Sequence, residues 1–266
     1  QEAKWVQLPD VVNGMDVNAS WFEQLPWPRK VLADDWLCRS TDKVTDIHIW
    51  CSYLNDMVTN HPIWLGIWSD VPAAAGNPSH PGELLWQQTF TPDKYEHYFW
   101  ECGVEQYFTP GPTPLINGPD SQVYYYVFYP TNAFTQQGSL QRPTNYWLSV
   151  YCPDAAWFGW KTATNVQQDV SVWNYWPPGS SPNWYPVQSP FQGEPLDLAF
   201  KITTSTNLPP EICPETNGVK YVQPPNLING MDVQASVPFV LADDFVCTNS
   251  GPVTDIHIWC SWLADQ

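Results

Sequence analysis

Positive charge is scarce in this chain of 266 residues. It has 10 Lys and Arg against 27 Asp and Glu, which gives a formal net charge of −17. So acidic a chain repels phosphate backbones and anionic lipid surfaces, and we therefore expect no nucleic-acid partner. The sequence also lacks any stretch approaching the roughly 20 apolar residues that cross a bilayer, so membrane insertion is not expected. Cations and neutral ligands are the partners that this composition favours.

Two further absences narrow the functional class. The sequence contains no G-x-S-x-G, H-E-x-x-H, Walker or dinucleotide-binding fingerprint. The strongest catalytic candidates are Asp46 and His48, which alternate along one expected strand near Asp34 and Asp35. The same alternation is ordinary on a solvated sheet face, and we predict that the chain is not an enzyme.

Glycoside hydrolysis is a further chemistry to weigh, because aromatic residues and carboxylates together line many sugar clefts. It needs two carboxylates roughly 5–10 Å apart. The acidic residues Asp70, Glu83, Glu101 and Glu105 are scattered along the chain without a signature. The sequence therefore supplies no reason to select a catalytic pair.

Aromatic residues and prolines are abundant. The chain has 17 Trp, 13 Tyr and 28 Pro. Short runs rich in aromatic and β-branched residues, separated by Pro- and Gly-rich breakers, are typical of strands, and no sustained 3.6-residue period indicates a helix. The expected strands are 44–54, 62–69, 83–90, 95–101, 122–129, 145–152, 156–162 and 196–203. This number of strands predicts an all-β fold, a two-sheet antiparallel β-sandwich of jelly-roll type.

The first of these strands has a two-residue period that assigns its faces. The face expected in the core carries Thr45, Ile47, Ile49 and Cys51. The face expected to be solvated carries Val44, Asp46, His48 and Trp50.

The chain begins again near its end. Residues 4–20 return at 220–236 with 11 of 17 positions identical. Residues 31–57 return at 240–266 with 17 of 27 positions identical. A period of about 210 residues is too long for a solenoid, whose units run roughly 20–50 residues. The repeated unit is therefore a whole domain.

This repeat sets the expected domain organisation. Residues 1–203 form one complete β-sandwich domain, 204–219 form a Pro- and Thr-rich linker, and 220–266 form the first part of a second domain of the same type. Prolines stiffen such a linker into a semi-rigid spacer. The partial copy is either one window on a longer tandem array or a segment completed by another subunit.

Several short motifs follow one another in a fixed order along 4–203: LADD, TDIHIW, SDVP, PGELLWQQTF, NYWLSV, AWFGWK and DLAFKI. In this order they resemble an uncharacterised family of secreted β-sandwich domains found, often in tandem, in large surface proteins of environmental bacteria. The resemblance implies a β-sandwich on the cell exterior and no known catalytic residues. Cys51, Cys152 and Cys213 are not general features of that family.

Seven cysteines in an acidic, Trp- and Pro-rich chain indicate an oxidising compartment. We therefore expect a secreted or cell-surface protein. Cys51 and Cys152 end two expected core strands, and a bridge between them would stabilise the fold by up to about 4–5 kcal/mol. Cys213, in the linker, would pair with a cysteine of an adjacent domain such as Cys247. The alternative is that these are buried free thiols, which pack as small hydrophobes.

A cluster of Trp residues around a Pro-rich loop is the basis for expecting sugar binding, because aromatic faces stack on sugar C–H surfaces. The candidates are Trp157, Trp160, Trp173, Trp176 and Trp184. The alternative is that these side chains fill the core and pack against the loop.

Two other sites are indicated by pattern. Asn18 begins an Asn-Ala-Ser sequence, which is an acceptor for N-glycosylation. The sequence predicts no firm cofactor, and calcium is the candidate at Asp34, Asp35 and Asp197, since hard carboxylate oxygens suit that ion. The alternative is that these aspartates turn inward and accept hydrogen bonds from the backbone.

The organisation and composition together predict a noncatalytic structural module of an extracellular stalk, matrix or filament. Its expected partner is a further copy of itself, joined head to tail by strand addition or domain docking. The alternative function is a carbohydrate-binding β-sandwich that uses surface Trp and Tyr on extracellular glycans.

Overall fold

The structure is a computed structural model that divides into two compact units, Gln1–Thr206 and Asn207–Gln266. In the first unit it describes residues 2–20, 30–74, 77–154, 157–177 and 183–204, and in the second unit residues 231, 233–236, 240–243 and 258. Cys213, Cys247, residues 205–219 and most of the second copy lie outside the described residues.

The described strands of the first unit form two sheets. The seven-stranded sheet has the order β1 (Glu2–Gln7), β13 (Phe200–Thr204), β4 (Val44–Tyr53), β10 (Phe158–Lys161), β2 (Met15–Asn18), β7 (Tyr95–Thr109) and β8 (Leu115–Phe128). The six-stranded sheet has the order β12 (Tyr185–Pro186), β11 (Val172–Tyr175), β3 (Lys30–Cys38), β9 (Thr144–Tyr151), β5 (Ile63–Val71) and β6 (His80–Phe90). The prediction of an all-β, two-sheet sandwich is confirmed.

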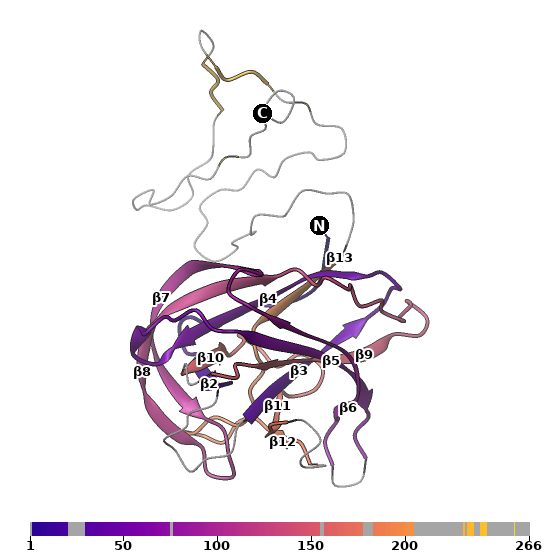
Figure 1. Cartoon of the computed structure of the whole chain (residues 1–266), viewed down its shortest axis with the longest axis vertical. Coiled ribbons are helices and arrows are strands. Elements are labelled where there is room, and N and C mark those ends of the chain that lie inside the picture. Colours follow the sequence, from indigo (N-terminus) through magenta and orange to yellow (C-terminus); the bar gives the residue numbers. More distant parts are fainter. Residues whose placement is uncertain are drawn as a thin grey trace. The chain divides into compact units, whose positions relative to one another are not determined.

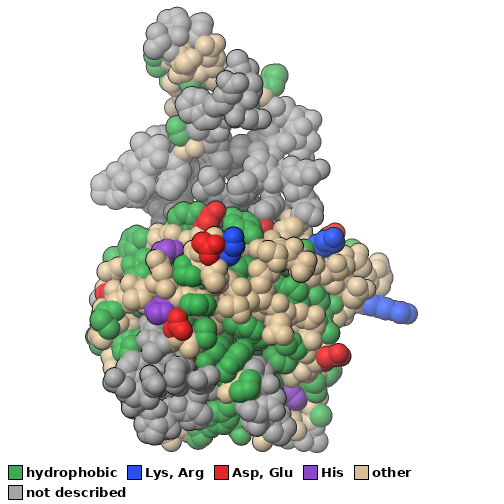
Figure 2. All heavy atoms as spheres, in the orientation of Figure 1, with side chains coloured by type: hydrophobic (Ala, Val, Ile, Leu, Met, Phe, Trp, Pro, Cys, Tyr) green, Lys and Arg blue, Asp and Glu red, His purple; other side chains and the backbone are tan. Residues whose placement is uncertain are grey.

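Helical structure is nearly absent from the described residues, where one 3-10 turn, Leu54–Asp56, follows β4. Within these residues, no helix is both long and apolar enough to span a bilayer. The face of the sandwich in Figure 2 carries mostly hydrophobic and uncharged polar side chains, with few acidic or basic groups.

The seven-stranded sheet closes on itself. Besides its neighbours β13 and β10, β4 pairs with β8 from Ile47↔Phe128 to Cys51↔Tyr124. Strands β4, β10, β2, β7 and β8 therefore form a continuous ring, in which β2 and β7 are the parallel pair. We call these five strands the strand ring. The long strands β7 and β8 curve together along one side of the molecule (Figure 1).

The main hydrophobic core lies between the two sheets. Alternate residues of each strand point inward, because side chains in a strand alternate between its two faces. The seven-stranded sheet contributes Val17, Ile47, Ile49, Phe108 and Phe128 among others. The six-stranded sheet contributes Leu32, Trp36, Leu65, Ile67 and Leu148 among others.

The second face of β4 differs from the expectation. Val44 belongs to the core, and Asp46, His48 and Trp50 are all buried. Trp50 is covered by Tyr125, at 4.8 Å between ring centroids, and by Trp100, at 5.5 Å. The prediction of a solvated face is therefore wrong, because aromatic side chains from β7 and β8 close over it.

Candidate functional site

The strand ring places charged side chains together on the face that points away from the main core. Asp16 of β2 lies opposite Lys161 of β10, and Glu105 of β7 lies opposite Asp120 of β8. Asp16 is also level with Tyr107 of β7 in the parallel pair. All five side chains are buried. We call Asp16, Glu105, Asp120 and Lys161 the carboxylate cluster.

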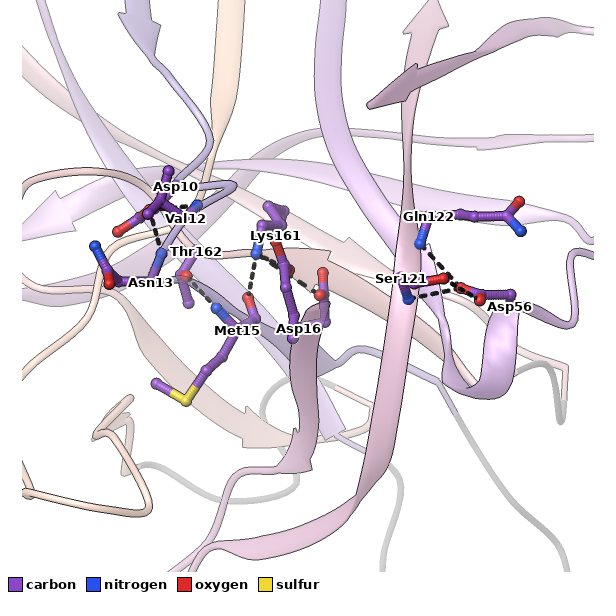
Figure 3. Close-up of polar contacts among 11 residues, drawn as sticks. Asp10, Val12, Asn13, Met15, Asp16, Asp56, Ser121, Gln122, Lys161 and Thr162 are labelled. Carbon is purple, nitrogen blue, oxygen red and sulfur yellow. Dashed lines mark hydrogen bonds and ion pairs between the residues drawn. The ribbon is translucent and has the colours of Figure 1, made fainter. Parts of the chain in front are cut away.

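Lys161 is the one cation of the carboxylate cluster. Its Nζ forms an ion pair with Glu105 Oε2 and lies 3.7 Å from Asp16 Oδ2. The same ammonium group donates a hydrogen bond to the carbonyl oxygen of Met15 at 3.4 Å. In Figure 3 the Lys161 side chain reaches toward both Met15 and Asp16.

The acidic oxygens outnumber the donors available to them. Among the described residues, no group donates a hydrogen bond to either oxygen of Asp16, to Glu105 Oε1 or to Asp120 Oδ2. One ligand atom from each of these three residues lies within 4.8 Å of the other two. Buried polar groups are almost always satisfied, so oxygens left without donors in one place require an explanation.

Burial and mutual repulsion change the acidity of the cluster. Burial, with the Asp16 charge adding to it and Lys161 opposing it, raises the pKa of Glu105 to about 8. Burial together with the charges of Asp16 and Glu105 raises the pKa of Asp120 to about 9. The charged forms of these carboxyl groups are disfavoured unless a cation compensates them. Asp16, Glu105 and Asp120 are the residues that could hold a metal, and their all-oxygen donor set is the one that hard cations prefer.

Three members of this cluster were not singled out by the sequence. Glu105 was considered as one scattered carboxylate, whereas Asp16, Asp120 and Lys161 were not considered. A signal exists for Asp16, because the sequence NGMDV recurs unchanged and places Asp232 at the same point of the second copy. The pairing of β2 with β7 joins residues about 90 positions apart in the chain, which no local pattern reveals.

The predicted calcium residues do lie near one another. Asp34 Oδ2 accepts hydrogen bonds from the Leu198 N–H at 2.6 Å and from Gln7 Nε2 at 2.9 Å. Its Oδ1 accepts from the N–H of Asp35 at 2.8 Å. Burial, reinforced by the charges of Asp197 and Asp35, raises the pKa of Asp34 well above its usual range.

Asp197 is occupied in the same way. Its carboxylate accepts the backbone N–H of Gln167 at 2.5 Å and that of Ser171 at 3.2 Å. The structure thus has the inward, backbone-bonded arrangement given above as the alternative. Asp35 Oδ1 accepts the N–H of Asp169 at 3.2 Å, whereas Asp35 Oδ2 has no partner among the described residues. Donors thus take most of the oxygens of Asp34, Asp35 and Asp197, and calcium at these residues stays a prediction.

Asp46 and His48 form part of a buried hydrogen-bond network. His48 Nε2 lies 2.8 Å from Asp46 Oδ2, and the Tyr125 hydroxyl lies 2.7 Å from His48 Nδ1. Thr203 Oγ1 also donates to Asp46 Oδ2. Burial lowers the pKa of His48 despite the neighbouring Asp46, whereas the pKa of Asp46 is lowered because hydrogen bonds from His48 and Thr203 outweigh its burial.

These pKa directions define one tautomer. An ionised Asp46 only accepts, so neutral His48 donates through Nε2–H and accepts the Tyr125 hydroxyl at Nδ1. The network joins β4, β8 and β13 through Asp46 Oδ2, whereas Asp46 Oδ1 has no partner among the described residues. This arrangement is what a structural role requires.

The described cysteines are free thiols. Cys51 and Cys152 are buried, and each lies in the main core. Burial raises the pKa of Cys152 to about 12 and that of Cys51 well above its usual range, with Cys152 adding to the latter. The charge of Cys152 therefore affects Cys51, although no bond joins the two sulfur atoms. A disulfide between them stays a prediction.

Two of the predicted sugar-stacking residues belong to the core. Trp160 is 0% exposed and donates its indole N–H to the carbonyl oxygen of Ala199 at 2.8 Å. Trp173 is 2% exposed and stacks on Tyr185 at 4.8 Å. The sugar-stacking prediction is wrong for these two, because neither ring offers a face to a ligand. Trp157 is half-buried and contacts Tyr107 edge to face.

Trp176 and Trp184 occupy a different position, on the outer face of the six-stranded sheet. Both are half-buried. Trp176 packs edge to face on Trp64 at 4.7 Å, and Trp184 packs in the same way on Trp68 at 6.0 Å. Trp64 and Trp68 belong to a second cluster with Trp147 and Tyr151. The sugar-binding hypothesis therefore rests on Trp176 and Trp184.

Asn18 is buried and fully engaged. Its Nδ2 donates to Thr109 Oγ1 at 3.1 Å. Its Oδ1 accepts from the Tyr107 hydroxyl at 3.0 Å and from the N–H of Ser20 at 2.9 Å. A glycan on Nδ2 does not fit this environment, and the glycosylation prediction is wrong because the acceptor pattern lies inside the strand ring.

Fold and site together define a two-sheet β-sandwich domain whose seven-stranded sheet encloses a polar cluster. The chain belongs to the family DUF7901, a domain of unknown function, whose family model matches residues 3–203 and again residues 219–266. No curated protein and no solved structure matches the chain. The resemblance to an uncharacterised domain family is thereby confirmed.

Proposed function

We propose that this chain is a noncatalytic structural module of an extracellular protein built from tandem copies of this domain. The observation that carries the proposal is the second family match, 219–266, which follows the match at 3–203 within one chain. Repetition of a whole domain along a chain is the construction of stalks, matrices and filaments.

The polar residues of the first unit support a structural role. Asp46 and His48 bond to each other and to side chains of β8 and β13. Asp34 and Asp197 accept backbone N–H groups that join loops to strands. These contacts use the polar atoms to hold strands together, whereas catalysis requires them to face a substrate.

The way that β4 is paired supports assembly with a further copy. In the first unit β4 takes its partners β8, β10 and β13 from later in the chain. The sequence VTDIHIWCS of β4 recurs at 253–261, and pairing of such a segment with strands of a further copy is the contact that we propose. Unpaired strand edges recruit such partners by strand addition.

Electron microscopy of the full chain, before and after reduction, tests this proposal. We expect regular beads or filaments with a repeat of about one domain. If Cys213 links neighbouring domains, reduction loosens these assemblies. Isolated particles in both conditions would contradict assembly, and turnover of any substrate that depends on Asp46 or His48 would contradict the noncatalytic role.

A second function, binding of neutral glycans, is favoured by the position of Trp176 and Trp184. Both lie over an aromatic cluster on the outer face of a sheet. Retention on insoluble cellulose, xylan and chitin provides the test. The change Trp184→Ala is expected to abolish retention, whereas Phe191→Ala, which removes another exposed aromatic ring, serves as the control. Unchanged retention in Trp184→Ala would rule out this binding surface.

A further inference from the structure

We propose that Asp16, Glu105 and Asp120 bind one calcium ion inside the strand ring, a site that is independent of the proposed structural function. The three residues come from β2, β7 and β8, which are adjacent strands of one sheet. Backbone pairing of Asp16 with Tyr107 and of Glu105 with Asp120 fixes the positions of the three carboxylates. The donors therefore stand on rigid elements.

The unsatisfied oxygens of Asp16 point to a ligand. This side chain is 0% exposed, and neither of its carboxylate oxygens accepts a hydrogen bond from the described residues. Asp34 and Asp56, which have no ligand role, differ from Asp16 in this respect, because backbone N–H groups donate hydrogen bonds to both. A buried carboxylate without donors is strongly unfavourable unless a cation compensates it.

Charge balance gives the valence of the ion. When ionised, the three carboxylates and the Lys161 ammonium carry a formal charge of −2. One divalent cation brings this sum to zero, and a monovalent cation does not. Neutralisation matters here because all four side chains are buried, where uncompensated charge is costly.

The donor chemistry selects calcium among divalent ions. The cluster offers carboxylate oxygens. The carbonyl oxygen of Met15 is nearby, because it accepts a hydrogen bond from Lys161 Nζ at 3.4 Å. Calcium takes six to eight oxygen ligands in irregular geometry, whereas magnesium demands a near-ideal octahedron and retains water. Three buried carboxylates in an irregular arrangement suit the larger ion.

Lys161 has a defined place in this site. It is the cation that partly neutralises the carboxylates when no metal is bound, and its ion pair with Glu105 occupies one of the metal's donors. Calcium and the ammonium group therefore compete for Glu105. Removal of the ammonium group is expected to increase the affinity for calcium.

The first test measures binding to the full chain after treatment with a chelator. Isothermal titration with CaCl₂ at constant ionic strength is expected to give one ion for each domain that carries Asp16, Glu105 and Asp120. A hundredfold excess of calcium over its Kd is expected to raise the midpoint of thermal unfolding by roughly 5–10 °C. The same titration with MgCl₂ is expected to give a smaller shift.

Variants locate the ion. Asp120→Asn and Glu105→Gln are expected to lose the calcium-dependent shift and at least tenfold in affinity. Glu101→Gln, on the exposed part of β7, is the matched control and is expected to behave as the unmodified chain. Absence of calcium binding by the unmodified chain, or full binding by both cluster variants, would overturn the proposal.

Lys161→Met keeps the test decisive if the carboxylate variants fail to fold. We expect this variant to unfold at a lower temperature without calcium and to be restored by it, with a larger calcium-dependent shift than the unmodified chain. A shift equal to or smaller than that of the unmodified chain would show that the cluster is only an ion-pair network.

Discussion

At the scale of single residues, the described carboxylates differ in their hydrogen-bond partners. Asp34, Asp56 and Asp197 accept backbone N–H groups and fasten one segment to another. Asp16 and Asp120 instead have oxygens without donors. Asp35 and Asp46 each have one oxygen without a partner among the described residues, so what distinguishes Asp16 is that neither of its oxygens has a donor.

Asp56 shows what a fastening carboxylate contributes. It follows β4 with a positive φ of 56° and accepts the N–H of Ser121 at 2.8 Å, the Ser121 hydroxyl at 2.5 Å and the N–H of Gln122 at 2.9 Å (Figure 3). We predict that Asp56→Ala lowers the free energy of unfolding by about 2–4 kcal/mol, because two backbone donors on β8 lose a charged acceptor. Urea denaturation measures this change.

Asp56→Asn is the control for that prediction. Asparagine tolerates a positive φ and keeps one acceptor oxygen, so it should lose less stability than alanine. Equal losses in the two variants would contradict this prediction, because tolerance of a positive φ and one retained acceptor oxygen would then contribute nothing.

Asp35 governs part of the dependence of stability on pH. Burial raises its pKa from 3.8 to about 8, and the charges of Asp169 and Asp197 act in the same direction, against hydrogen bonds from Asn145 and the N–H of Asp169. Between about pH 4 and pH 8 the folded state therefore holds a proton that the unfolded state has released. Stability falls as pH rises through this window.

We predict that Asp35→Asn makes this fall shallower, by on the order of 1 kcal/mol per pH unit, since asparagine does not titrate. Urea denaturation at pH 5, 6.5 and 8 gives the slope. Other buried carboxyl groups with raised pKa act in the same direction in both proteins, so the difference between them isolates Asp35. Identical slopes would mean that Asp35 is ionised in the folded state.

At the scale of elements, the two short strands β2 and β10 complete the strand ring. Gly159 of β10 permits the close packing of β10, because a Cβ there would lie 2.6 Å from Tyr107 Cε2 and 3.1 Å from Asp16 Cβ. β10 also joins β4 to β2. A disturbance at this position therefore acts on the ring as a whole.

We predict that Gly159→Ala destabilises the domain by about 1–3 kcal/mol, the usual cost of overpacking a filled interior. Gly111→Ala is the matched control, because its Cβ would meet first the flexible end of Lys30, at 3.1 Å. Thermal unfolding of both variants makes the comparison, and a Gly159→Ala protein as stable as the control would show that the ring can widen at β10.

The elements differ in how well the sequence predicts them. β4, β5 and β9 agree with the expected strands within two residues at each end, since each has dense β-branched and aromatic residues. β3 was missed because it is buried on both faces, so its sequence KVLADDWLC does not alternate. The start of β8 was missed because Leu115–Asp120 lies in a Pro- and Gly-rich run that resembles a loop.

The candidate site was harder to predict than the fold, for a physical reason. Period-2 alternation shows which residues share a face of one strand, and it correctly groups Ile47, Ile49 and Cys51 in the core. It cannot show which strands are neighbours. The carboxylate cluster depends on β2 lying parallel to β7 and on β4 closing against β8, and both pairings are non-local.

At the scale of the whole molecule, the net charge opposes the proposed association of one copy with another. A charge of −17 repels like copies and keeps them apart at low ionic strength, whereas the proposed assembly requires contact between copies. Salt screens repulsion over about 10 Å at 0.1 M, so self-association should strengthen as salt is added.

Sedimentation velocity of the full chain, over a hundredfold range of concentration and at low and physiological salt, tests the structural proposal most directly. We predict species larger than the 30.4 kDa monomer whose proportion rises with concentration and with salt. A single 30.4 kDa species under every condition would contradict assembly as the function of this domain.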